Sequence, residues 1–113
     1  MIDISVGIKL FNDLDFFSAH DFFEDIWVEA KKDEKDFFQG LVQISVGCYH
    51  LICGNINGAK SQLSKGKLKL EKYKPFFYKI DLTNFEIGII DLINKIDSNS
   101  ITKQDIPKIK LIF

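Results

Sequence analysis

Apolar residues recur along most of this chain at spacings of three and four, the period of an α-helix with one buried face. The pattern predicts five helices, over residues 4–11, 15–32, 37–53, 56–73 and 82–96. A chain of 113 residues is long enough for one domain and too short for two. We therefore predict a single all-α domain over residues 1–113. It is a compact bundle of two helical hairpins, with the closing helix at 82–96 and an extended tail at 101–113.

Capping residues mark where several of these helices begin. Asp36 ends a charged connector and is expected to cap the third helix, and Asn55 is expected to cap the fourth. Asp81 or Thr83 can cap the fifth helix, where Thr83 with Glu86 has the spacing of a capping box. Each of these side chains can accept a bond from a backbone N–H that has no partner within its own helix.

Two glycines carry information about the third and fourth helices. Gly54 stands where the third helix must stop, because glycine readily adopts the left-handed conformation that ends a helix. Gly66 lies within the apolar seam of the fourth helix, where it costs about 1 kcal/mol relative to Ala. We expect Gly66 to admit a bulky neighbour, such as a Phe ring.

The third helix is apolar nearly all round, which predicts that it lies at the centre of the bundle. It nevertheless carries a polar row: Gln39, Gln43 and His50 fall at i, i+4 and i+11 and share one stripe.

The second helix carries a related polar group. His20, Glu24 and Trp27 fall at i, i+4 and i+7 and share one face. Phe16 and Phe23 point the same way, so we expect this face to be turned inward. If the second and third helices form an antiparallel pair, their polar rows can meet.

Buried polar groups without partners cost a few kcal/mol each, so these side chains need partners. One interpretation is a structural network, in which Glu24 accepts hydrogen bonds and fixes the helix register. Its candidate donors are His20, Gln39 and the indole of Trp27.

A second interpretation is a small-ligand or catalytic pocket formed by His20, Glu24, Gln39 and Gln43, with His20 or Glu24 as the general base. A third is a metal site, to which His50 would add a ligand. The second-helix motif HDFFE lacks the second His of the HExxH zinc motif and the Glu-x-x-His units of di-iron bundles. We therefore expect no metal and no cofactor.

The composition limits the classes of partner that the protein is expected to bind. All fifteen basic residues are Lys, and the net charge is −1, which argues against nucleic-acid binding because neither guanidinium forks nor an overall basic field is present. Residues 1–36 are mostly acidic and residues 60–79 are mostly basic. We interpret them as two solvated helices of opposite charge. The alternatives are a complementary dimer surface and a site for an acidic partner on the basic helix. The longest apolar stretch is too short and too polar to span a bilayer, and no signal-peptide pattern is present, so we expect a cytoplasmic protein and no membrane partner.

An ordered series of short motifs resembles one family. The motifs are Phe11-Asn12, Ala19-His20-Asp21, Glu24, Trp27, the run from Phe38 to Gln43, His50, and Gly54-Asn55-x-x-Gly58-Ala59. Over about residues 5–73 the chain resembles the DUF309 family of small bacterial and archaeal proteins. Members commonly have Glu before and after the Ala-His pair, where this chain has Ser18 and Asp21. The resemblance implies a compact helical fold and supplies no activity.

The sequence contains no nucleophile elbow, phosphate loop or zinc signature, so its activity stays unknown. We expect a non-enzymatic helical interaction or scaffold domain that forms a homodimer or binds another protein. The alternative is a small-ligand-binding protein or hydrolytic enzyme that uses the polar pocket described above.

Overall fold

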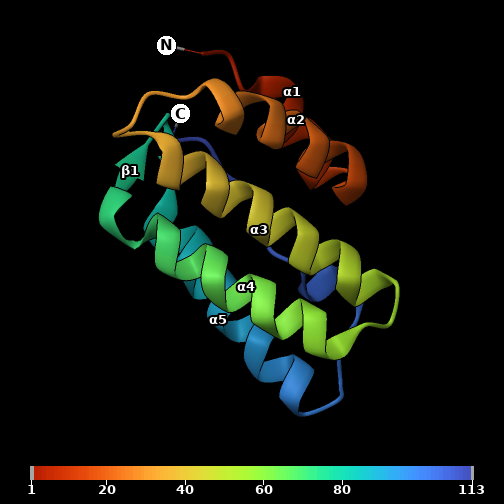
Figure 1. Cartoon of the computed structure of the whole chain (residues 1–113). Coiled ribbons are helices and arrows are strands. Elements are labelled where there is room, and N and C mark those ends of the chain that lie inside the picture. Colours follow the sequence, from red (N-terminus) through yellow and green to blue (C-terminus); the bar gives the residue numbers. More distant parts are fainter. Residues whose placement is uncertain (1, 113) are drawn as a thin grey trace.

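Five α-helices build the domain, as the periodicity predicts, within residues 2–112, which the computed structural model describes. They are α1 (Ser5–Asn12), α2 (Phe16–Glu29), α3 (Lys35–Ile52), α4 (Ile56–Leu70) and α5 (Leu82–Asp97). Figure 1 shows α3 between the α1–α2 pair and α4, with α5 beside α4. The ends of the predicted domain, Met1 and Phe113, lie outside the described residues.

The core confirms that α3 is the central helix. Phe37, Phe38, Leu41, Ile44 and Cys48 are all buried, and they contact buried residues from the rest of the bundle. No helix within residues 2–112 is long and apolar enough to cross a membrane.

Helices α3 and α4 pack closely at a pair of glycines. A Cβ atom added to Gly66 would lie 2.9 Å from the carbonyl oxygen of Gly40 and 2.8 Å from Cδ1 of Ile44. A Cβ atom added to Gly40 would lie 3.2 Å from the carbonyl oxygen of Gly66. Gly66 therefore admits the α3 backbone and a bulky neighbour, which is the side chain of Ile44 rather than a Phe ring.

The start of α3 differs from the prediction. The helix begins two residues early, so that Glu34 is the N-cap residue without a side-chain cap bond, and Asp36 lies inside the first turn. Asp36 is therefore not a cap. The other end agrees with the sequence: Gly54 adopts a φ of 84°, and the Asn55 side chain accepts a bond from the Gly58 N–H to begin α4.

The start of α5 uses one of the two caps that the sequence offers. Asp81 is the N-cap and accepts a bond of 2.9 Å from the Asn84 N–H. Thr83 is already helical, so the predicted capping box with Glu86 does not form. Glu86 instead accepts a hydrogen bond of 2.7 Å from Lys74.

The aromatic segment after α4, Phe76 to Tyr78, takes part in a short hairpin. After a 3₁₀ turn at Glu71–Tyr73, strands β1 (Phe76–Phe77) and β2 (Ile80–Asp81) pair in antiparallel register. The ring of Phe37 on α3 lies 4.8 Å from that of Phe77 and is stacked on Tyr78 at 5.4 Å.

The C-terminal segment runs back over the bundle and includes a 3₁₀ turn at Lys103–Asp105. Leu111 bridges to Ile80, so the segment extends the hairpin edge. The side chain of Asn12, at the end of α1, holds the backbone of Ile109 through two hydrogen bonds: its amide nitrogen donates at 3.0 Å and its oxygen accepts at 2.8 Å.

Candidate functional site

His20 and Glu24 form a loose pair at the edge of α2. The His20 Nε2 and Glu24 Oε2 atoms are 3.5 Å apart, and His20 Nδ1 lies 3.0 Å from the backbone oxygen of Phe17. The Phe17 carbonyl oxygen can only accept, so this contact needs a proton on Nδ1, and the contact between Nε2 and Glu24 is long for a hydrogen bond. The Glu24 side chain is 50% exposed, and the expectation that it points into the core is wrong.

Trp27 has a different partner from the one expected. The ammonium group of Lys35 lies 5.4 Å from the centre of the Trp27 ring and also donates to the backbone oxygens of Trp27 and Val28. Lys35 therefore caps the C-terminal end of α2 while it packs over the indole.

Gln39 and Gln43 line a groove between α3 and α4, and His50 lies at the far end of α3, beside the turn into α4. The imidazole Nδ1 of His50 is 3.4 Å from Nδ2 of Asn55. The predicted polar set thus occupies three places, and no hydrogen bond or ion pair within residues 2–112 joins the α2 members to the α3 members.

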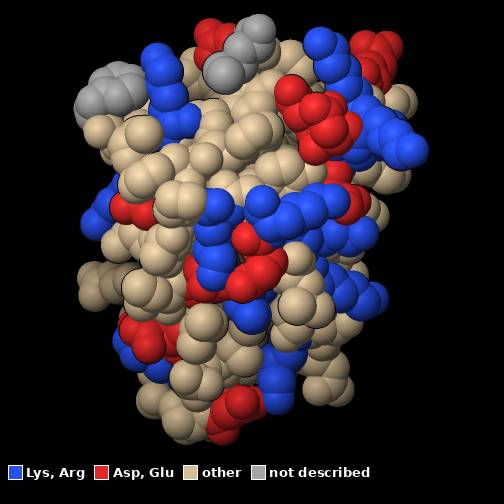
Figure 2. Space-filling view, turned by 90° about the vertical axis from the view of Figure 1, so that its left-hand side faces the viewer, with Lys and Arg blue, Asp and Glu red and all other residues tan. Residues whose placement is uncertain are grey.

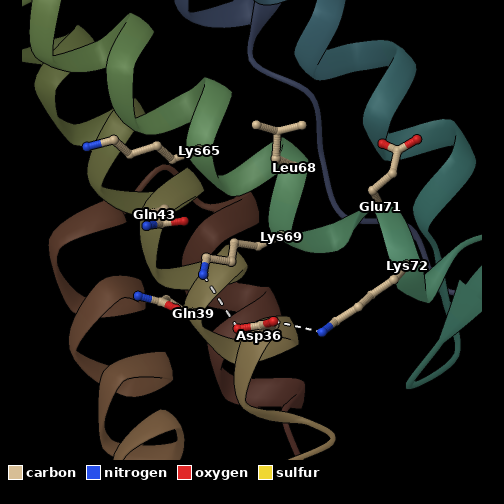
Figure 3. Close-up of a pocket in the computed structure, with 8 residues that line it drawn as sticks. All are labelled: Asp36, Gln39, Gln43, Lys65, Leu68, Lys69, Glu71 and Lys72. Carbon is tan, nitrogen blue, oxygen red and sulfur yellow. Dashed lines mark hydrogen bonds and ion pairs between the residues drawn. The ribbon is translucent and has the colours of Figure 1, made fainter.

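The groove itself has a volume of about 540 Å³. Its α3 wall is made by Asp36, Gln39 and Gln43. The opposite wall, here called the α4 wall, is made by Lys65, Leu68 and Lys69 of α4 and by Glu71 and Lys72 of the 3₁₀ turn that follows. Figure 3 shows the two amides one above the other on α3, with Lys69 reaching across from α4 beside them toward Asp36. The volume lies in the range of ordinary ligand and peptide sites.

Sequence reasoning found the two glutamines and missed the opposite wall. Lys65, Lys69 and Lys72 fall at i, i+4 and i+7, so they share one face of α4 and its 3₁₀ extension. Asp36 and Gln43 fall at i and i+7 on α3. This spacing was the available signal, but the charge asymmetry alone did not reveal which helix the lysines would face.

An ion-pair cluster closes one end of the groove. Lys72 donates to Oδ2 of Asp36 at 2.7 Å, and Lys69 approaches Oδ1 at 3.5 Å (Figure 3). The hydrogen bond from Lys72 lowers the pKa of the Asp36 carboxyl, and the same bond raises the pKa of Lys72. Two lysines therefore share one carboxylate.

The remaining charges of the groove are unequally paired. Glu71 forms an ion pair of 3.0 Å with Lys74, which lies outside the groove lining. Lys65 has no ion pair among the residues that the structure describes. The groove therefore presents more positive than negative charge.

Gln43 carries an unusual polar atom. Its side-chain oxygen Oε1 is buried and has no hydrogen-bond partner among residues 2–112. Such an orphaned acceptor costs about 1–3 kcal/mol, because its bond to water is lost without replacement. A ligand N–H group in the groove can satisfy this acceptor once the Gln43 amide turns its buried oxygen toward the groove.

The cysteine and metal-ligand side chains give little support for a catalytic or metal site. Burial raises the pKa of the Cys48 thiol, which disfavours the thiolate needed for nucleophilic chemistry. Across residues 2–112, no group of three or more His, Cys, Asp or Glu side chains is arranged to hold a metal ion.

Comparison with known proteins adds a family. Residues 4–62 match the family described as a domain of unknown function, DUF309. No curated protein matches the chain. The matched residues include α1 to α3 and the α3 wall of the groove, whereas Lys65, Leu68 and Lys69 on the α4 wall lie beyond it.

Proposed function

The chain belongs to the DUF309 family, whose description assigns no activity, and from the geometry we propose that it is a non-enzymatic helical interaction domain with its binding site in the α3–α4 groove. The observation that carries this proposal is the groove lining. Paired amides on one wall face lysines and a 68% exposed leucine, Leu68, on the other. Amides, cations and an exposed apolar side chain suit recognition of a protein segment.

The alternative is a hydrolytic or small-ligand site at His20 and Glu24. A general base works best in a cavity from which water is excluded. Glu24 is half exposed, its contact with His20 is long, and neither residue lines the groove. These observations favour the interaction domain.

A protein partner fits better than a nucleic acid. Figure 2 shows one face of the molecule, on which lysines are interleaved with acidic side chains rather than gathered into one basic field. Ion pairs such as Lys60 with Asp97 and Lys95 with Asp105 also neutralise lysines. Local neutralisation of this kind weakens the sequence-independent attraction to phosphates.

Self-association and location complete the proposal. A second copy of the chain is one protein partner to be tested, by sedimentation velocity over a range of concentrations. We propose a cytoplasmic location, which the two free cysteines, Cys48 and Cys53, support because free thiols are usual in a reducing compartment. A fluorescent fusion at either end checks the location.

The test of function is a selection from a random peptide library displayed on phage, using the full chain as bait. We expect enriched peptides to bind the wild type and to lose binding to Leu68→Asp. Ile87→Asp is the matched control, because Ile87 is 57% exposed on α5, away from the groove. Both changes place a charge on the surface of a helix, so neither should unfold the protein.

Two results would overturn the proposal. One is a library that yields no peptide sensitive to Leu68→Asp while sedimentation shows a monomer throughout. The other is turnover, in a panel of ester, amide and phosphoester substrates, that His20→Ala and Glu24→Gln abolish.

A further inference from the structure

We propose that the α3–α4 groove holds an extended acidic segment of a partner protein, with Gln39 and Gln43 bonded to its backbone and Lys65 paired with one of its carboxylates. This inference rests on the proposed function and names the chemistry of the partner. Four features of the groove carry it: the spacing of the amides, the orphaned oxygen, the charge and the exposed leucine.

The spacing of the two glutamines matches the repeat of an extended peptide. Residues four apart on a helix are displaced by about 6 Å along its axis. In an extended chain, every second residue directs its N–H and C=O groups to the same edge, a repeat of about 6.6 Å. Gln39 and Gln43 can therefore each meet one residue of such a segment, with the amide N–H donating and the amide oxygen accepting.

The length of the groove limits the segment. Its α3 wall extends from Asp36 to Gln43, a rise of seven residue steps, or about 10 Å of helix. About three residues of extended chain span that distance. A short linear segment is thus the occupant, and a folded surface would contact only the rim.

The orphaned oxygen gives the amide wall its selectivity. Oε1 of Gln43 is buried without a donor in the free protein. When the Gln43 amide turns toward the groove, a backbone N–H supplies that donor, whereas an ionised carboxylate supplies only acceptors. The acceptor therefore favours a peptide over a simple anion.

The charge of the opposite wall selects acidic residues. Lys69 and Lys72 share the single carboxylate of Asp36, and Lys65 pairs with no acidic group among residues 2–112. A carboxylate placed beside Lys65 gains attraction without displacing an existing ion pair. Leu68 then offers an apolar contact to a neighbouring side chain of the segment.

The probe is a capped pentapeptide, acetyl-Ala-Glu-Leu-Glu-Ala-amide, titrated into the isotope-labelled full chain and followed by NMR. We expect shifts at Gln39, Gln43 and the α4 wall. The same peptide with Gln in place of both Glu should bind about threefold more weakly. A version methylated on its central backbone nitrogens, which keeps every side chain, should bind about tenfold more weakly.

Two variants assign the roles on the protein side. Lys65→Met keeps most of the side-chain stem and should weaken binding of the acidic peptide about threefold while leaving the Gln peptide unchanged. Gln43→Leu should weaken both peptides about tenfold and yet raise the melting temperature, because it removes the orphaned oxygen. If the role of Gln43 were purely structural, the variant would not combine weaker peptide binding with a higher melting temperature. Ile87→Asp again serves as the control.

The outcomes separate this inference from the proposed function. The inference is overturned if the Gln peptide binds as tightly as the acidic one, if backbone methylation has no effect, or if inorganic phosphate produces the same shifts as the peptide. In each of these cases the proposed function stands, provided that Leu68→Asp still abolishes binding of the library-selected peptides. Loss of every groove-dependent interaction overturns both.

Discussion

The glycine contact between α3 and α4 leads to a specific stability prediction for Gly66→Ala. Two effects oppose each other in this variant. Alanine is favoured over glycine within a helix by about 1 kcal/mol. Against this, the new Cβ would lie 2.9 Å from the Gly40 carbonyl oxygen and 2.8 Å from two carbons of Ile44, which is closer than such atoms normally approach.

The contact should outweigh the propensity. An isoleucine side chain can shift slightly, but the Gly40 oxygen belongs to the backbone of the central helix and moves only if α3 and α4 separate. Overpacking of this kind costs about 1–3 kcal/mol. The net expectation is a loss of about 1 kcal/mol, which lowers the melting temperature of a domain this size by about 4 °C.

Urea unfolding followed by circular dichroism measures this change at 25 °C. The matched control is Ser64→Ala, an exposed position on the same helix, where the propensity gain acts alone and should stabilise by less than about 0.7 kcal/mol. Adding Ile44→Val to Gly66→Ala should cost less than the sum of the single changes, because the Cδ1 contact disappears while the Gly40 contact remains. A Gly66→Ala protein more stable than the wild type by about 1 kcal/mol would refute the close-contact argument.

Three further predictions follow from polar contacts. Glu24→Gln should change the free energy of unfolding by less than about 1 kcal/mol in thermal melts, because its pairing is exposed; a loss of 2 kcal/mol or more would restore the structural-network interpretation. Asn12→Ala should lower the free energy of unfolding by about 1–3 kcal/mol and speed hydrogen exchange at the Ile109 amide. Asn94→Ala, at an exposed position of α5, should do neither. Equal exchange rates at Ile109 in both variants would contradict a stabilising role for the Asn12–Ile109 hydrogen bonds. The lowered pKa of Asp36 means that its stabilising contribution is present above about pH 4 and is lost as pH falls through the folded-state value. The stability advantage over Asp36→Asn, below about 1 kcal/mol at pH 7, should therefore shrink in acid urea titrations, and a constant difference would argue against the ion pair.

The sequence by itself determined the local structure. Helix periodicity gave the five helices, and Asn55 and Asp81 cap the helices at which the sequence placed them, because a cap acts on backbone groups within three residues of itself. The same local logic put Gln39 and Gln43 on one stripe of α3. The ion pairs of Asp36 could not be predicted in this way, because its partners, Lys69 and Lys72, are more than thirty residues away.

Which neighbour the polar stripes of α2 and α3 face depends on tertiary packing. A hydrophobic pattern fixes which residues of a helix lie together, but the rotation of that helix against its neighbours depends on packing contacts far away in sequence. In α2 the packing buries Phe16 and Phe23 and leaves Glu24 at the exposed edge of the same face. In α3 the close approach at Gly40 and Gly66 brings the glutamines beside the α4 lysines, so Gln39 and Gln43 line a groove with Lys65 instead of meeting His20.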